Sequence, residues 1–168
     1  QVWTPIAFTH IAAGGWHTCG INTRAETICW GDNEYEQMEV PNMVFTTLSA
    51  GLGHTCGHTQ NQTVECWGDN LHGQSEAPNT TFVQFDAGIR HSCGVTTSGA
   101  ALCWGDDEYE QSSPPSENFV HVAAGEIHSC GVLSSGQILC WGDDSHGQSS
   151  PTEGIYRQVF AGPTYSCG

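Results

Sequence analysis

Residues 87–105 read A-G-I-R-H-S-C-G-V-T-T-S-G-A-A-L-C-W-G, and the same pattern, A-G-x-x-H-[ST]-C-G followed by C-W-G, recurs along the chain every 37 residues. Four copies contain both halves of the pattern, and no insertion changes their spacing. A constant period of this length is typical of stacked supersecondary units, each too small to bury its own apolar face. The period therefore predicts one repeat array rather than several independent domains.

The array is expected to fill residues 1–168 with about four and a half copies. The copies are expected near residues 8–44, 45–81, 82–118 and 119–155, with a partial copy at 156–168. The partial copy stops at Gly168 before a C-W-G segment of its own, so Cys167 has no partner in the register of the repeat. We therefore expect an excerpt of a longer chain, in which Cys167 is unpaired or linked to another segment.

Each copy is predicted to consist of strands and turns. A short apolar element such as Phe82-x-x-Phe85 precedes Ala-Gly, a second element carries His-[Ser/Thr]-Cys-Gly, and a third carries Cys-Trp-Gly. In the partial copy the first element is expected at Tyr156-x-x-Val159. No stretch has the i, i+3, i+4 spacing of an amphipathic helix, so the chain is predicted to be all-β. A polar stretch with a fixed glutamine returns the chain to the next copy: Gln37, Gln74, Gln111 and Gln148.

The cysteines are spaced for disulfides rather than for zinc. Nine residues separate the two cysteines of each copy, whereas structural zinc sites usually contain a tight C-x2–4-C pair. If the two lie on adjacent antiparallel strands, they oppose one another across a hairpin and can be bridged. One disulfide per repeat is therefore predicted: Cys19–Cys29, Cys56–Cys66, Cys93–Cys103 and Cys130–Cys140.

Composition points to the outside of the cell. Disulfides favour an oxidising compartment, and the glycosylation triplets at Asn61 and Asn79 fit a secreted glycoprotein. Eighteen acidic residues against three arginines and no lysine give a net charge of −15, which repels phosphate backbones and anionic lipids. No apolar run is long enough to span a bilayer. We expect N-glycans and protein partners, no nucleic acid, and no membrane insertion within this segment.

Two residue types recur at fixed positions of the repeat and are expected to be structural. The first type is tryptophan, whose large flat side chain could fill the gap between neighbouring sheets at every junction. Stacking on carbohydrate is the alternative role for these tryptophans. A column of imidazoles could bind a transition metal, but a hydrogen bond from each histidine to the backbone of its own repeat explains the column more simply. Tyr165 replaces the histidine in the partial copy and favours that simpler explanation. The residues are Trp30, Trp67, Trp104, Trp141, His17, His54, His91 and His128.

Two acidic loops carry oxygen ligands at alternating positions, a spacing that a calcium site can use. The corresponding loops of the second and fourth copies have His-Gly-Gln instead, so the loops alternate along the chain. A solvated turn is the simpler interpretation, and no cofactor is expected. The calcium candidates are Asp32, Glu34, Glu36, Asp106, Glu108 and Glu110.

The full pattern, A-G-x-x-H-[ST]-C-G followed by C-W-G-[DN]-[DN]-x-x-x-Q, resembles the repeat of the regulator of chromosome condensation family. The resemblance covers the whole chain and implies blades of a β-propeller, or blade-like units of an open β superhelix. The paired cysteines resemble the extracellular branch, which includes crinkly-type receptor ectodomains and secreted algal arrays such as mastigoneme components. Propellers of this family usually have seven blades, which is more than this chain supplies. A closed propeller and an open superhelix therefore both remain as expectations.

No catalytic motif accompanies the repeat. The G-x-S-x-G, H-E-x-x-H and G-x-x-x-x-G-K patterns are absent from the sequence, and we expect no enzyme. The leading expectation is a secreted structural or scaffold protein whose disulfide-stapled β repeats self-associate into an extracellular assembly or filament. The alternative is a protein-binding propeller module, such as a receptor ectodomain or an inhibitor. A guanine-nucleotide exchange factor-like propeller is a more distant alternative.

Overall fold

Every complete repeat folds into a three-stranded antiparallel sheet in a computed structural model of the chain. The structure describes residues 5–168, so residues 1–4 of the expected array lie outside the described residues. The strands follow sequence order within each sheet, which confirms the all-β prediction. The strands are β1 (Phe8–Ala13), β2 (His17–Asn22) and β3 (Thr27–Gly31); β4 (Phe45–Ala50), β5 (His54–Thr59) and β6 (Val64–Gly68); β7 (Phe82–Ala87), β8 (His91–Thr96) and β9 (Ala101–Gly105); and β10 (Phe119–Ala124), β11 (His128–Leu133) and β12 (Ile138–Gly142).

The partial repeat contains only two short strands, β13 (Phe160–Ala161) and β14 (Ser166–Cys167). The expected first strand at Tyr156–Val159 is therefore wrong in position. In the complete fourth repeat Phe119 pairs with Leu133, and the residue that would pair with Tyr156 in the same register lies beyond Gly168. Pairing is consequently limited to Phe160 with Cys167 and Ala161 with Ser166.

The second and third strands of each sheet bring its cysteines face to face. Cys93 pairs with Cys103 in the register of β8 and β9, and their Cα atoms are 4.0 Å apart. The turn between these strands has positive φ at Gly99, and the corresponding turn of the first repeat has positive φ at Ala25. The structure contains the four predicted disulfides: Cys19–Cys29, Cys56–Cys66, Cys93–Cys103 and Cys130–Cys140. Cys167 is free and exposed.

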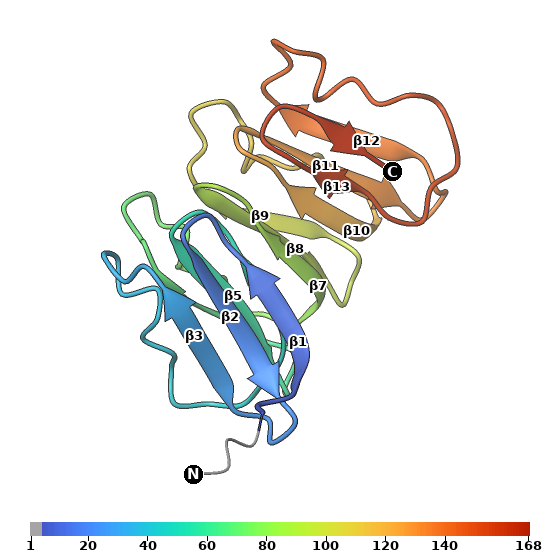
Figure 1. Cartoon of the computed structure of the whole chain (residues 1–168). Coiled ribbons are helices and arrows are strands. Elements are labelled where there is room, and N and C mark those ends of the chain that lie inside the picture. Colours follow the sequence, from blue (N-terminus) through green and yellow to red (C-terminus); the bar gives the residue numbers. More distant parts are fainter. Residues whose placement is uncertain (1–4) are drawn as a thin grey trace.

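The sheets are arranged in an arc about a common axis, in an open propeller-like array (Figure 1). The first strands lie innermost, since residues of β1, β4, β7, β10 and β13 line one shared hollow. This hollow faces the axis, and the third strands lie on the outside of the array.

The hydrophobic core is divided among the junctions between repeats. Phe45, Leu48 and Trp67 of the second repeat pack against Ala12, Cys19 and Ile21 of the first. Clusters of the same kind join the second repeat to the third, the third to the fourth, and the fourth to the partial repeat. Each sheet therefore depends on its neighbour for burial, as the indel-free period predicted.

Among residues 5–168 no helix is long and apolar enough to cross a membrane.

Removing one disulfide is expected to destabilise the array measurably. The double variant Cys93→Ala/Cys103→Ala should lose about 2–3 kcal/mol of unfolding free energy, because the crosslink closes a short loop in the unfolded chain. Guanidinium unfolding of the oxidised protein measures the change. The control is Cys167→Ala, which alters an exposed thiol and should stay within about 0.5 kcal/mol of the parent. Equal stabilities for the double variant and the control would contradict the prediction.

Candidate functional site

The repeated histidines join one repeat to the next. The Nε2 atom of His91, at the start of β8, lies 2.8 Å from the Oγ of Ser129 in the fourth repeat. The expected bond to the backbone of the same repeat is therefore wrong, because stacking places the hydroxyl of the following sheet against each ring. The same contact occurs at every junction: His17 with Thr55, His54 with Ser92 and His128 with Ser166.

At the three junctions where the partner is a serine, its hydroxyl fixes which nitrogen of the imidazole carries the hydrogen. Ser129 Oγ donates to the backbone oxygen of Gln111 at 2.9 Å. Its single hydrogen is used there, so its oxygen accepts from the Nε2–H of His91. The Nδ1 of His91 then carries a lone pair, and it has no hydrogen-bond partner in the described part of the chain. The serine partners of His54 and His128 also donate to a backbone oxygen, so His54, His91 and His128 are neutral donors.

Burial keeps these rings neutral. It lowers the pKa of His54 to about 4 and that of His91 to about 3, although the carboxylates of Asp69 and Asp106 partly oppose the shift. A neutral ring that donates to a hydroxyl explains the position better than a metal ligand does. Within residues 5–168 no group of three His, Cys, Asp or Glu side chains is placed to hold a metal ion.

A glycine lies three residues before each junction histidine, and its lack of a side chain has a steric reason. A methyl group at Gly51 would collide with the ring of His54 and with the backbone oxygen of Gly88 in the next repeat. The Ala-Gly pair of each copy therefore marks a close approach of two repeats at the junction.

The tryptophans fill the same junctions from the outer strand. Trp104 packs on Phe82 and lies in the cluster that joins the second and third repeats. Its indole Nε1 donates to the backbone oxygen of Gln74 at 2.9 Å. Trp67 and Trp141 make the same bond to Gln37 and Gln111. Trp30, in the first repeat, has no such carbonyl beside it in the described chain and is 43% exposed.

The conserved spacing of glutamine has a structural cause that the sequence interpretation missed. The side chains of Gln37, Gln74 and Gln111 are completely buried, and Gln148 is nearly so. The Oε1 of Gln111 accepts from the backbone nitrogen of Tyr109, which closes the loop after β9. Its backbone oxygen accepts from both Trp141 and Ser129 of the following repeat. The signal in the sequence was the fixed position of glutamine within loops whose other residues change.

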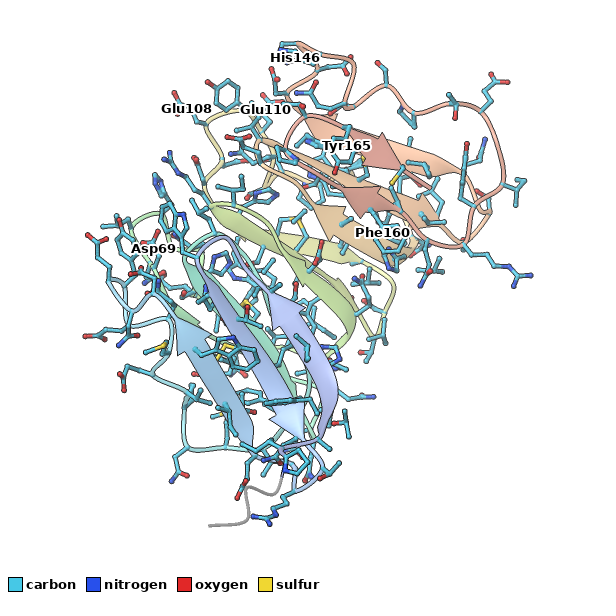
Figure 2. All side chains as sticks on the ribbon, viewed as in Figure 1. Asp69, Glu108, Glu110, His146, Phe160 and Tyr165 are labelled. Carbon is cyan, nitrogen blue, oxygen red and sulfur yellow. A yellow bond between two sulfur atoms is a disulfide. The ribbon has the colours of Figure 1, made fainter. Side chains whose placement is uncertain are left out.

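The six calcium candidates do not converge on one another. Asp32 Oδ2 accepts from the Gln37 side chain at 2.9 Å, and Asp106 Oδ1 accepts from the backbone nitrogen of Glu108 at 3.2 Å, so both aspartates cap turns. Glu34, Glu36, Glu108 and Glu110 are exposed. Figure 2 shows Glu108 and Glu110 projecting outward from the loop after β9. The hydrogen bonds of Asp32 and Asp106 close both loops as turns, and no group of three His, Cys, Asp or Glu side chains in residues 5–168 is placed to hold a metal ion.

These loops make one end of the array strongly acidic. The end also carries exposed side chains that are not common to all four copies, including Leu71 at 77%, Tyr109 at 46% and His146, which Figure 2 labels. We call residues 32–39, 69–76, 106–113 and 143–150 the loop end. Twelve of the eighteen acidic residues lie there: Asp32, Glu34, Glu36, Glu39, Asp69, Glu76, Asp106, Asp107, Glu108, Glu110, Asp143 and Asp144.

A second group of unique residues faces the axis. The Oγ of Ser49 donates to Asp86 at 2.8 Å, and the backbone nitrogen of Ala124 donates to the other carboxylate oxygen at 3.0 Å. Burial raises the pKa of Asp86. These bonds link the inner strands of three successive repeats. The sequence signals this group only through a departure from the repeat, because the position of Asp86 is held by Ala12 and Ala123 in two other copies.

Comparison with known proteins identifies the repeat. A family model described as the Regulator of chromosome condensation (RCC1) repeat matches residues 8–37, 45–74, 82–111 and 119–148, which is more than half of the chain. Each matched range begins at the first strand of a complete repeat and ends at its buried glutamine. No match was found among curated proteins.

Solved structures give the same fold. The entire ectodomain of the Physcomitrella patens receptor kinase CR4 is 28% identical over 99% of this chain, with a TM-score of 0.83. The CRINKLY WD40 ectodomain of the Arabidopsis thaliana receptor kinase ACR4 is 27% identical over all of it, with a TM-score of 0.82. This chain spans 50% and 63% of those two chains. Prp20p from Saccharomyces cerevisiae shares the fold, with a TM-score of 0.78. It is 16% identical over 98% of this chain, which spans 56% of its length.

Proposed function

This chain belongs to the regulator of chromosome condensation (RCC1) repeat family, and we propose that it is a non-enzymatic, extracellular protein-binding module that recognises its partner through the loop end. One observation carries the proposal: the recurring side chains and the exposed side chains of a repeat have different uses. The side chains that recur in every copy are used in contacts between repeats, whereas the exposed side chains of the loop end alternate between two kinds, Glu-Tyr-Glu in the first and third copies and Leu-His-Gly or Ser-His-Gly in the second and fourth.

The recurring residues leave little chemistry for a reaction. The ring Nε2 of His91 is engaged by Ser129, the indole of Trp104 by Gln74, and the cysteines of each repeat by one another. A buried neutral histidine with its donor engaged is poorly placed as a general base. A rigid scaffold that displays variable loops is instead the usual design of a recognition module.

The charge and the glycosylation triplets support the loop end as the binding face. Its carboxylates favour a partner with a basic surface, because complementary charge speeds association. Asn61 lies exposed at the turn between β5 and β6, and Asn79 lies exposed before β7, close to the turns between second and third strands. Glycans at both positions would stand at the opposite end of the array and leave the loop end accessible.

An extracellular location is supported by the disulfides and by the receptor ectodomains that this chain resembles at 28% and 27% identity. Disulfides persist in oxidising compartments and are rare in the cytosol.

The binding proposal is tested with two variants matched in charge. Glu108→Gln/Glu110→Gln removes two exposed carboxylates from the loop end, and Glu117→Gln/Glu153→Gln removes two exposed carboxylates from loops outside it. The immobilised proteins are compared for the secreted proteins that they retain from the source organism. We expect one retained protein that the loop-end variant binds at least about tenfold more weakly, and that the control binds normally. Equal binding by both variants, or no specific retention, would contradict the proposal.

A structural assembly is the second candidate, and the constant 37-residue period favours it, because equivalent surfaces recur along the chain. Repeated weak contacts between such surfaces could build a filament through multivalency. Sedimentation velocity at increasing protein concentration tests this candidate, and a monomer at every concentration would contradict it.

A further inference from the structure

The loop after β9 holds a tyrosine in a strongly acidic setting. Residues 105–111 read G-D-D-E-Y-E-Q, so three acidic residues directly precede Tyr109 and one directly follows it. Asp107, Glu108 and Glu110 are exposed. Acidic loops by themselves are solvated turns in this molecule, and the feature that singles out this loop is the exposure of its phenol ring.

The side chain of Tyr109 is 46% exposed, whereas that of its counterpart Tyr35 is half-buried in the same Glu-Tyr-Glu-Gln sequence. The ring of Tyr35 reaches the turn of the next repeat at Gly53, where an added Cβ would lie 3.4 Å from its Cδ2 atom. The residue equivalent to Gly53 at the junction of the third and fourth repeats is Ile127. Its larger side chain fills the place that glycine leaves open for Tyr35, and the ring of Tyr109 stays in contact with solvent.

Hydrogen bonds hold the acidic loop in a fixed shape. The backbone nitrogen of Tyr109 donates to Gln111 Oε1 at 2.8 Å, and that of Glu110 donates to the backbone oxygen of Asp107 at 3.1 Å. Glu110 has a positive φ of 63°, which closes the turn. Figure 2 shows Glu108 and Glu110, the two neighbours of the tyrosine, projecting outward from this turn. The folded loop therefore presents a phenol between two exposed carboxylates.

An accessible phenol with acidic neighbours is the acceptor that tyrosine O-sulfation uses. The sulfate donor, a nucleotide phosphosulfate, is an anion, so the enzyme that binds it has a cationic site that also attracts carboxylates beside the acceptor. Three arginines and no lysine in the chain leave little positive charge to oppose this approach. The transfer takes place in the lumen of the secretory pathway, which is also where disulfides such as Cys93–Cys103 form.

We propose that Tyr109 is a site of tyrosine O-sulfation. The modification rests on the extracellular location proposed above, since only a chain that passes through the secretory pathway meets the enzyme. The sulfate ester adds a fixed negative charge to the loop end and strengthens its attraction for a basic partner. Tyr35 is a poor acceptor despite its acidic neighbours, because its ring is half-buried.

The transfer is a substitution at sulfur. The phenol oxygen of Tyr109 attacks the sulfur of the phosphosulfate, a new O–S bond forms, and the S–O bond to the phosphate breaks. The nucleotide leaves with the electron pair of that bond as its bisphosphate. The phenol proton passes to a base of the enzyme, and nothing is oxidised or reduced.

The test uses the folded, disulfide-bonded protein, a purified tyrosylprotein sulfotransferase and a radiolabelled nucleotide phosphosulfate. Mass mapping of the products locates the label. We expect Tyr109 to be sulfated at least about tenfold faster than Tyr35. Tyr109→Phe should lose the label and Tyr35→Phe should retain it. No binding partner is present, so a failure of sulfation leaves the binding function of the loop end standing.

Carboxylate variants test the part played by the acidic neighbours. Glu108→Gln/Glu110→Gln should lower kcat/KM for Tyr109 at least about tenfold, whereas Glu117→Gln/Glu153→Gln, which removes exposed carboxylates elsewhere, should leave it unchanged. Equal rates at Tyr35 and Tyr109 in the folded protein would overturn the proposal. A rate that does not respond to the loss of Glu108 and Glu110, or a label found only after the disulfides are reduced and the chain is unfolded, would overturn it as well.

The protein isolated from its native source separates sulfate from phosphate, which adds nearly the same mass. A tyrosine sulfate ester is lost in hot acid and resists phosphatases, whereas phosphotyrosine survives the acid and is cleaved by phosphatases. We expect an acid-labile, phosphatase-resistant group on Tyr109. A phosphatase-sensitive group there, or an unmodified Tyr109, would contradict the assignment.

Discussion

Acidification from pH 7 to 4.5 is expected to cost the folded array roughly 4–5 kcal/mol through His54 and His91 alone. Both rings are neutral in the folded state because burial lowers the pKa of His54 to about 4 and of His91 to about 3. In the unfolded chain they titrate near their ordinary value of 6.5. Below pH 6.5 the unfolded state therefore binds protons that the folded state does not.

The sign of the effect follows from that difference. The stabilising contribution is fully present above pH 6.5 and is lost as the pH falls toward about 4 for His54 and about 3 for His91. Burial also lowers the pKa of His17, His121 and His128, which adds to the loss. Asp86 acts in the opposite direction, because burial raises the pKa of its carboxyl and favours the folded state in acid.

Guanidinium unfolding at several pH values between 7 and 4.5 measures this dependence. The matched variant is His91→Gln, which keeps a side-chain N–H near Ser129 but does not titrate. We expect it to be less stable at pH 7 and to lose less stability on acidification than the parent. A pH dependence that is as steep in His91→Gln as in the parent would show that the buried ring does not cause it.

Replacement of Trp104 by alanine is expected to cost about 3–5 kcal/mol of unfolding free energy, the usual cost of removing a large buried aromatic side chain. The ring lies between the second and third repeats, and its loss also leaves the Gln74 backbone oxygen without the indole donor. Because each repeat buries its apolar residues against a neighbour, damage at one junction should weaken the cooperativity of the array.

Trp30→Ala is the matched control, since Trp30 occupies the same position of the first repeat. Trp30 is 43% exposed and its ring contacts Phe8. Its replacement should cost no more than about 1.5 kcal/mol. Chemical unfolding of both variants in parallel decides the matter, and a similar loss in each would contradict the assignment of the buried tryptophans as junction plugs.

The local features of the fold followed from the sequence. The strands, the hairpin turns and the disulfides depend on residues within a single copy, so the spacing of Cys93 and Cys103 was enough to predict them. The resemblance of the pattern to one repeat family was confirmed for the same reason, because it depends on the spacing of residues within a copy.

The contacts between copies could not be predicted in this way. His91 and Ser129 are 38 residues apart, one more than the period, and only the stacking of two sheets brings them together. The buried Gln111 was misread as part of a polar connection, because its burial depends on Trp141 and Ser129 of the next repeat. Asp86 was missed because its partners lie on two other repeats.

The most direct test of the account is a long-range ¹H–¹⁵N spectrum of the histidine rings at neutral pH, recorded for the parent and for Ser129→Ala. We expect His91 to be neutral, with its proton on Nε2. We also expect Ser129→Ala to shift the ring signals of His91, which lies one repeat away. A proton on Nδ1, or a His91 spectrum that does not respond to the loss of the Ser129 hydroxyl, would contradict the claim that the recurring residues hold successive repeats together.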